Sequence, residues 1–157
     1  LINNGTEETK GNELTKAAFP LLKEATELNF VGNVEAKELL QGVCDIAITD
    51  GFTGNAILKS LEGTSKSIFK AIKNQLLNSG FKAKLGGLLI KNALSDLKDQ
   101  FDDTKEGGAI LLGVQAPVIK AHGSSNEEAI FNAIRQANKI LTSNVVEEIA
   151  NHFRNLS

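Results

Sequence analysis

The chain has 157 residues, of which 41% are hydrophobic and 23% are charged, and its formal net charge at pH 7 is −2. These values are ordinary for a soluble globular domain, and the apolar runs are too short to cross a membrane. One cysteine, Cys44, excludes a disulfide framework and a cysteine-rich metal site. No signal peptide is visible, so we expect a reducing, cytoplasmic location.

The start of the chain does not have the character of a natural N-terminus. The sequence contains no methionine and opens with Leu1 and Ile2, which are typical of the end of a strand. We therefore expect a piece of a longer protein, so that part of an active site could be contributed by residues that are absent.

A helical pattern comes first. Apolar residues at helical spacing run from Leu14 to Leu22. Pro20 lies inside this pattern, and because proline removes a helical hydrogen bond, it predicts a kink or a break there. A short strand is expected at residues 28–31.

Strand and helix patterns continue to alternate. We expect a short helix at residues 34–41, capped by Asn33 and ended by Gly42, followed by a strand at residues 43–48. This alternation predicts an α/β fold with a mostly parallel sheet and flanking helices.

The middle of the chain is helical over a long stretch. Apolar residues at helical spacing predict one helix at residues 55–78 and a second at residues 81–101, bent at Gly86 and Gly87. Because no strand lies between these helices, we expect a protruding helical hairpin at about residues 55–101.

The last third returns to the alternating pattern. A loop at residues 102–108 leads to two expected strands, at residues 109–114 and 118–121. A helix that begins near Asn126 is expected to continue, with a bend, to Phe153.

The first candidate site follows the strand at residues 43–48. In open α/β sheets ligands bind beyond the carboxyl ends of the strands, and a helix start offers N–H groups to an anion. Asp50, with Gly51, Thr53 and Gly54, would lie at such a position. The alternative is a simple turn in which Asp50 accepts local N–H groups.

The second candidate site follows the last expected strand and contains Lys120, His122 and Gly123. Ser124 or Ser125 could cap the next helix. His122 could bind a phosphate oxygen, donate a proton or merely pack.

The third candidate site, Lys10-Gly11-Asn12-Glu13, also lies between a strand and a helix, although a solvated turn is its default interpretation. Three such loops would meet at one edge of one sheet.

The expected hairpin carries an asymmetric charge. Between residues 63 and 95 there are six lysines and no acidic residue. This composition suits an anionic partner, either a membrane surface or an acidic protein. The alternative is a solvated lysine face over a dimer or core contact. The candidate contact residues near the tip are Phe81, Lys82, Lys84, Leu85, Leu88 and Leu89.

Other chemistries lack support in the sequence. Cys44 lies in an apolar stretch and is interpreted as a small buried hydrophobe. His152 is expected on the surface, and two histidines and one cysteine at wide spacing give no metal-ligand pattern. No P-loop and no G-x-G-x-x-G motif is present, so nucleotide binding is not predicted.

Four stretches of the chain, in order, resemble the bacterial phosphate acyltransferase (PlsX) family. They are Asn4-Gly5-Thr6-Glu7-Glu8-Thr9-Lys10-Gly11-Asn12-Glu13-Leu14, Phe30-Val31-Gly32-Asn33-Val34-Glu35-Ala36, Thr49-Asp50-Gly51-Phe52-Thr53-Gly54-Asn55 and Val118-Ile119-Lys120-Ala121-His122-Gly123-Ser124-Ser125. The resemblance covers nearly the whole chain and about the second half of the family's length.

The resemblance implies an enzyme that forms acyl phosphate from acyl-[acyl-carrier-protein] and inorganic phosphate in bacterial phospholipid synthesis. It implies an α/β fold similar to phosphotransacetylases and isocitrate-dehydrogenase-like enzymes, with residues 1–157 as the C-terminal part of a single domain. A cytoplasmic homodimer, peripherally associated with the membrane, is also implied. No cofactor, metal or nucleic acid is expected.

Site residues follow from the same resemblance. The implied catalytic residues are Lys10, Asp50, Asn55 and His122. The implied phosphate-binding residues are Gly11, Asn12, Gly51, Thr53, Gly54, Lys120, Gly123 and Ser124. Two alternatives stay open: a phosphotransacetylase-like enzyme that uses acyl-CoA, and a non-catalytic module that binds a membrane or partner through the basic hairpin.

Overall fold

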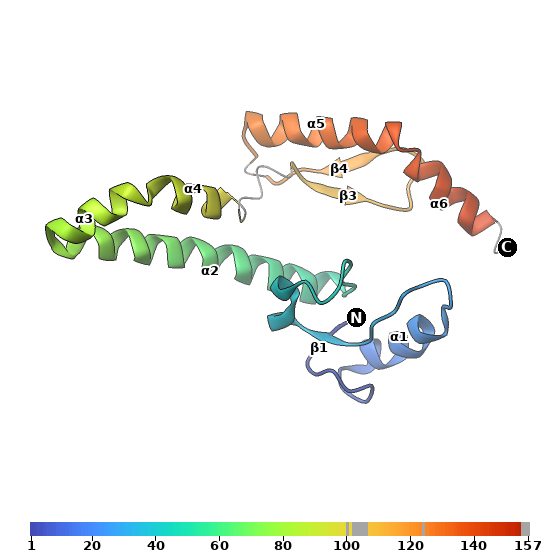
Figure 1. Cartoon of the computed structure of the whole chain (residues 1–157). Coiled ribbons are helices and arrows are strands. Elements are labelled where there is room, and N and C mark those ends of the chain that lie inside the picture. Colours follow the sequence, from blue (N-terminus) through green and yellow to red (C-terminus); the bar gives the residue numbers. More distant parts are fainter. Residues whose placement is uncertain (100, 102–106, 124, 155–157) are drawn as a thin grey trace. The chain divides into compact units, whose positions relative to one another are not determined.

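The computed structural model describes residues 1–99, 101, 107–123 and 125–154. This part of the chain is mixed α/β, with helices predominating and four short strands, as labelled in Figure 1. The chain separates into two compact units, Leu1–Thr64 and Ser65–Ser157.

The first unit is built on a parallel strand pair. β1 (Ile2–Asn3) pairs with β2 (Val34–Glu35), with Ile2 opposite Val34. Both of these side chains are buried, so the pair forms part of the core of the unit. The Ile2 N–H also donates to the Ile48 carbonyl at 2.9 Å, which places the segment before Asp50 beside β1.

Two expected strands of this unit are not regular strands. Residues 28–31 and 43–48 have no strand assignment, although Ile48 has the bond to Ile2. In the first of them, the Phe30 ring instead packs edge-on against Phe19 of α1, with 5.3 Å between ring centroids. Phe30 therefore contributes a packed side chain rather than a strand pairing, whereas Leu28 and Val31 beside it are exposed.

Helix α1 (Glu13–Glu24) continues through Pro20. A break at Pro20 is therefore wrong, and a kink there stays a prediction. Pro20 is exposed, so the carbonyl that loses its helical donor one turn earlier can bond to water. The buried Phe19 holds the other face of the helix against the unit.

The expected helix at residues 34–41 is shorter and tighter than predicted. Its first two residues form β2, and Ala36–Gln41 form a 3₁₀ helix, η1. Asn33 does not cap it. Glu35 is the residue before its first turn, and its N–H donates to the Glu38 carboxylate at 2.9 Å. Gly42, with φ +70°, ends η1 as predicted.

Helix α2 (Gly51–Asn78) begins four residues before the expected start and ends where predicted. The earlier start has a local cause. Asp50 Oδ1 accepts the N–H groups of Phe52 and Thr53 at 3.0 and 2.9 Å, which satisfies two donors that a helix start leaves unpaired.

Two helices follow, α3 (Gly80–Leu89) and α4 (Lys91–Asp99), and they join at Ile90 rather than at Gly86 and Gly87. Gly87 has another role. A Cβ at Gly87 would lie 3.2 Å from the Leu76 side chain, so a glycine lets α3 approach α2. The Phe69 and Phe101 rings also meet, at 6.3 Å between centroids.

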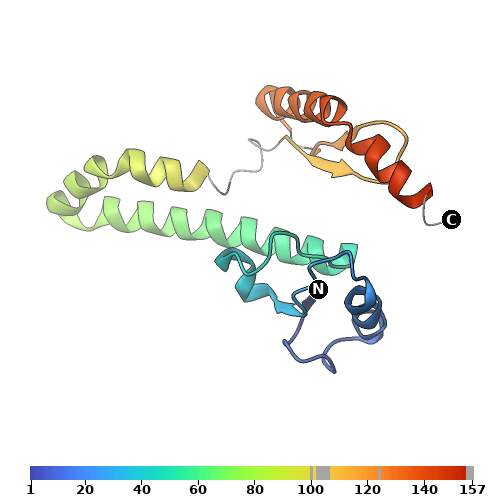
Figure 2. The same cartoon turned by 45° about the vertical axis from the view of Figure 1, so that its right-hand side comes forward.

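The second unit also contains an antiparallel hairpin, β3 (Ala109–Leu111) and β4 (Val118–Lys120). These strands are shorter than predicted, and the start of the loop expected at residues 102–108 lies outside the described residues. Helix α5 (Glu127–Thr142) lies over the hairpin, as Figure 2 shows. Gly107, with φ +82°, passes so close to the backbone of Ala133 that a side chain would overlap it.

The expected bend in the last helix is confirmed. α5 ends at Thr142 and α6 (Val145–Arg154) follows, with Asn144 at φ 59° between them. Asn126, rather than Ser124 or Ser125, caps α5 by accepting the Ala129 N–H. The strand pairs that the structure describes are thus one parallel and one antiparallel.

Candidate functional site

The loop of residues 4–12 connects β1 to α1 and carries Lys10, which is exposed. The Lys10 N–H donates to the Glu7 carbonyl at 3.1 Å and closes a turn. The Lys10 carbonyl accepts the Asn3 side-chain amide at 3.1 Å. The backbone of Lys10 is therefore held on both sides while its ammonium group faces solvent.

Two long-range contacts anchor this loop to the rest of its unit. Asn33 Nδ2 donates to the Glu7 carbonyl at 3.0 Å, and the Glu8 carboxylate pairs with Lys23 of α1 at 2.6 Å. The ion pair is exposed, so its contribution to stability is small. The Asn33 contact is the buried one, because this side chain is only 6% exposed.

Gly11 and Asn12 complete the loop. Gly11 has φ +103°, a conformation that favours glycine, and a Cβ there would overlap the side chains of Asn3 and Thr15. Asn12 caps α1 by accepting the Thr15 N–H at 2.9 Å. These two residues therefore shape the loop, and Lys10 is the group within it that can bind an anion.

Asp50 is a capping residue of α2. Its hydrogen bonds with the Thr53 side chain and with the backbone N–H groups of Thr53 and Phe52 lower the pKa of its carboxyl group. The Gly54 N–H donates to the Asp50 carbonyl at 2.9 Å. The N–H groups of the first turn are thus used by Asp50 itself, and its negative charge disfavours an anion at this helix start.

Thr53, Gly54 and Asn55 lie in the first two turns of α2. A Cβ at Gly54 would overlap the Thr49 side chain, so glycine allows the helix to lie close to the preceding segment. Asn55 is exposed. Its carboxamide is therefore open to a ligand, whereas Gly51 and Gly54 act through the backbone path.

The loop after β4 carries the second group of predicted residues. Lys120, His122 and Gly123 are exposed, and the His122 carbonyl accepts the Ser125 N–H at 3.0 Å. Ser124 lies outside the described residues. An exposed lysine and histidine two residues apart can bind an anion together, and the histidine can also carry a proton.

The predicted site residues are divided between the two units. Lys10, Asp50 and Asn55 belong to the first, and the bond between Ile2 and Ile48 joins the two segments that lead to Lys10 and Asp50. Lys120 and His122 belong to the second unit. That all of them meet in one cleft stays a prediction.

Helix α3 presents apolar and basic side chains to solvent. Phe81 and Leu89 are 80% and 79% exposed, and Lys82 and Lys84 are also exposed. The other apolar residues predicted to make contacts, Leu85 and Leu88, are exposed as well.

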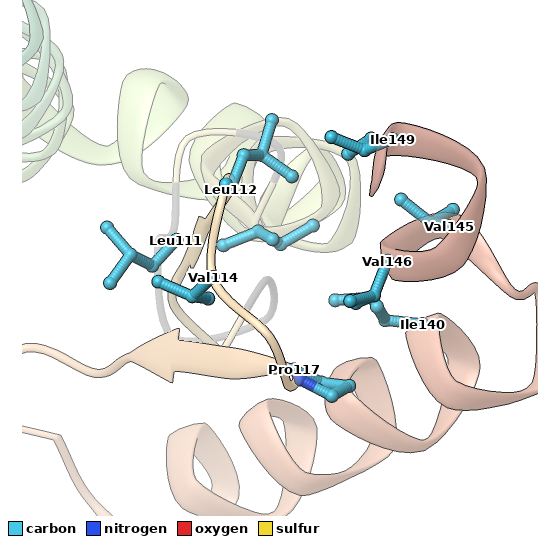
Figure 3. Close-up of a pocket in the computed structure, with 10 residues that line it drawn as sticks. Leu111, Leu112, Val114, Pro117, Ile140, Val145, Val146 and Ile149 are labelled. Carbon is cyan, nitrogen blue, oxygen red and sulfur yellow. The ribbon is translucent and has the colours of Figure 1, made fainter. Parts of the chain in front are cut away.

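The second unit also contains an apolar pocket that sequence reasoning missed. Figure 3 shows Leu111, Leu112 and Val114 on one side of it and residues of α5 and α6 on the other. All of its lining side chains are aliphatic, and none belongs to a predicted site residue. Apolar residues on both sides of the hairpin turn were the signal that could have indicated it. The lining residues are Ile110, Leu111, Leu112, Gly113, Val114, Pro117, Ile140, Val145, Val146 and Ile149.

Sequence reasoning also missed Asn3 and Asn33, whose side chains bond the Lys10 and Glu7 carbonyls and so hold the loop of residues 4–12. The only signal was an asparagine at the end of β1 and another just before β2, and the second of these was interpreted as a helix cap.

Within the described ranges, no group of three or more His, Cys, Asp or Glu side chains could hold a metal ion. The helices described are all too short or too polar to cross a bilayer.

Comparison with known proteins gives the family. Residues 1–148 match the family model described as "Fatty acid synthesis protein". The chain is 54% identical to a phosphate acyltransferase of Pediococcus pentosaceus over 98% of its length, and 56% identical to one of Lysinibacillus sphaericus over 99%. It covers 44% and 47% of those two relatives, so it spans about half their length. The chain belongs to the bacterial phosphate acyltransferase family.

Proposed function

We propose that the complete protein transfers an acyl group from acyl-[acyl-carrier-protein] to inorganic phosphate and so forms acyl phosphate for phospholipid synthesis. The observation that carries this proposal is the 54% identity to a phosphate acyltransferase over 98% of the chain. The braced loop that presents Lys10 to solvent is consistent with it, because the second substrate is an anion.

In the proposed reaction a phosphate oxygen attacks the thioester carbonyl carbon. The new C–O bond forms, the carbonyl oxygen carries negative charge, and the C–S bond then breaks to release the thiolate of the carrier. Phosphate is already largely anionic at neutral pH, so positioning and charge stabilisation supply most of the rate. The acyl group passes directly to phosphate, without a covalent enzyme intermediate.

Each site residue has a role in this scheme. Lys10, Lys120 and His122 hold phosphate through charge and hydrogen bonds, and the exposed carboxamide of Asn55 stabilises the developing oxyanion. Asp50 fixes the start of α2 through its bonds to Phe52 and Thr53, and so positions Asn55 in the next turn. This gives Asp50 a positioning role in place of direct contact with phosphate.

For this chemistry the two units must present their loops to one cleft. We infer that in the complete protein the short strands belong to one mostly parallel sheet, of the phosphotransacetylase and isocitrate-dehydrogenase-like kind. The helices α2 to α4 would project from that sheet as a hairpin. Lys10, Asp50, Asn55 and His122 would then converge at its carboxyl edge.

The exposed side chains of α3 support a second contact. Leu88 and Leu89 are 69% and 79% exposed and lie among lysines, a combination that suits an anionic lipid surface. We propose a cytoplasmic protein whose α3 touches the membrane. The flank of α2, where Ile68 and Ile72 are also exposed, would meet a second subunit in a homodimer.

The test uses the complete protein with acyl-carrier-protein and CoA thioesters of the same acyl chain. Phosphate-dependent formation of acyl phosphate from the carrier-protein thioester is the expected result. A preference for acyl-CoA would instead favour a phosphotransacetylase. If neither donor gives acyl phosphate, while α3 still binds vesicles, the non-catalytic module is the better description.

A further inference from the structure

We propose that Asn33 is a positioning residue for phosphate binding and that it acts on Lys10 through the carbonyl group of Glu7. This inference rests on the proposed function, in which Lys10 holds phosphate. Asn33 lies outside the loop of residues 4–12, directly before β2, and its side chain bonds Glu7 of the loop, 26 positions away in sequence.

The base of this contact is rigid. The backbone on both sides of Asn33 is bonded to Leu1. The α-amino group of Leu1 donates to the Gly32 carbonyl at 2.9 Å, and the Val34 N–H donates to the Leu1 carbonyl at 2.9 Å. Leu1 and Val34 are both buried. The strand pair therefore fixes the point from which the Asn33 side chain reaches the loop.

The Glu7 carbonyl oxygen joins this base to the turn. It accepts Asn33 Nδ2 at 3.0 Å and the Lys10 N–H at 3.1 Å. A carbonyl oxygen has two lone pairs, and both are used here. Because the same atom receives both bonds, the position of the Lys10 backbone depends on where Asn33 holds Glu7.

Asn3 completes the arrangement from the other side. Its Nδ2 donates to the Lys10 carbonyl at 3.1 Å, and its Oδ1 accepts the Asn4 N–H at 2.9 Å. Asn3 thus bonds the Lys10 carbonyl directly, and Asn33 bonds the Glu7 carbonyl that accepts the Lys10 N–H. A displacement of about 1 Å at a substrate-binding group can cost up to 10²-fold in rate, so such bracing has functional consequences.

The other half of the Asn33 amide separates this role from simple core packing. Its Oδ1 is buried and has no hydrogen-bond partner among the described residues. A buried acceptor without a partner is unfavourable, and a leucine of similar size would remove it. For stability alone, leucine would therefore suit this position at least as well as asparagine.

The experiment compares the complete enzyme with its Asn33→Leu variant. Removal of the donor should raise the KM for phosphate roughly 10-fold while the KM for the acyl donor stays within about twofold. Hydrogen exchange at the Lys10 amide should become faster, because its turn loses the anchor. The melting temperature should change little. If Asn33→Leu does not fold, Asn33→Ser, which is too short to reach Glu7, takes its place.

Two control variants make the outcome decisive. Phe19→Leu removes buried volume from the same unit and leaves the hydrogen bonds of Glu7 and Lys10 in place, so it should lower the melting temperature and leave the KM for phosphate unchanged. Lys10→Ala tests the underlying proposal. If Lys10→Ala leaves the KM for phosphate unchanged, the role of Lys10 is wrong. If Lys10→Ala raises it but Asn33→Leu changes neither that KM nor exchange at Lys10, the positioning role of Asn33 is overturned.

Discussion

The loop of residues 4–12 and helix α3 differ in how far their side chains are held by contacts within the chain. The loop is polar and is completed by its own unit, through the Asn33 amide, which is only 6% exposed, and the ion pair of Glu8 with Lys23. In α3 the large apolar side chains, such as Phe81 at 80% exposure, have no cover of this kind. The comparison agrees with the two proposals made above, in which the loop binds a small anion and α3 contacts a large surface.

This difference follows from the energetics of each group. A loop that binds an anion gains from rigidity, because ordering it beforehand lowers the entropic cost of binding. An apolar side chain gains only when its surface leaves water, at about 25 cal/mol for each Å². Substitutions in the loop should therefore change catalysis or local order, and substitutions in α3 should change association.

The largest expected effect tests whether the loop after β4 belongs with the loop of residues 4–12. His122→Ala in the complete enzyme should lower kcat/KM by roughly 10²-fold or more if His122 contacts phosphate or the oxyanion. The melting transition should persist, because His122 is exposed. Normal kinetics together with a lost transition would identify a structural histidine instead.

The second expected effect concerns α3. The double variant Leu88→Glu, Leu89→Glu should reduce sedimentation of the complete protein with anionic vesicles by roughly 10-fold for each leucine, because each loses its apolar burial. Activity on a soluble acyl-carrier-protein thioester should not change. Undiminished vesicle binding would contradict a membrane contact at α3. It would favour the acidic carrier protein as the partner of the lysines.

A smaller effect is expected at Gly11. Gly11→Ala forces a side chain into a backbone with φ +103° and against Asn3 and Thr15. The strained conformation alone should cost about 1–2 kcal/mol of unfolding free energy, measured by thermal denaturation. The matched control is Gly63→Ala, because a Cβ at Gly63 meets nothing within 4 Å. An equal loss in both variants would contradict the bracing of the loop.

The smallest effect concerns Asp50. The pKa of its carboxyl group is lowered in the folded protein from the ordinary value of 3.8, chiefly by the hydrogen bond with the Thr53 side chain. The stabilisation is therefore present above pH 3.8 and is lost as the pH falls through the lower folded value. Titration of the Asp50 carboxyl by NMR should show this lowered pKa, and Thr53→Val should move it back upward. An unchanged pKa in Thr53→Val would exclude that hydrogen bond as the main cause.

Sequence reasoning recovered the features that depend on neighbouring residues. The end of α2 at Asn78, the stop at Gly42 and the bend between α5 and α6 were all predicted, because helix ends follow from local turn residues. The family could also be predicted, since four motifs in order are specific. Asp50 was placed correctly before a helix, but whether it caps that helix or binds a ligand stayed open.

Tertiary structure decided what depends on residues far apart in the chain. No local pattern shows that Asn33 reaches Glu7, or that Phe30 packs on Phe19 instead of joining a strand. A break at Pro20 was predicted from the lost N–H, but its exposed position made the loss tolerable. A bend was predicted at Gly87 because its neighbours in sequence do not reveal its role. Only the folded structure shows that Leu76 lies beside it. Short stretches of sequence thus determine local hydrogen bonds. The choice of distant partners depends instead on which surfaces the folded chain brings together.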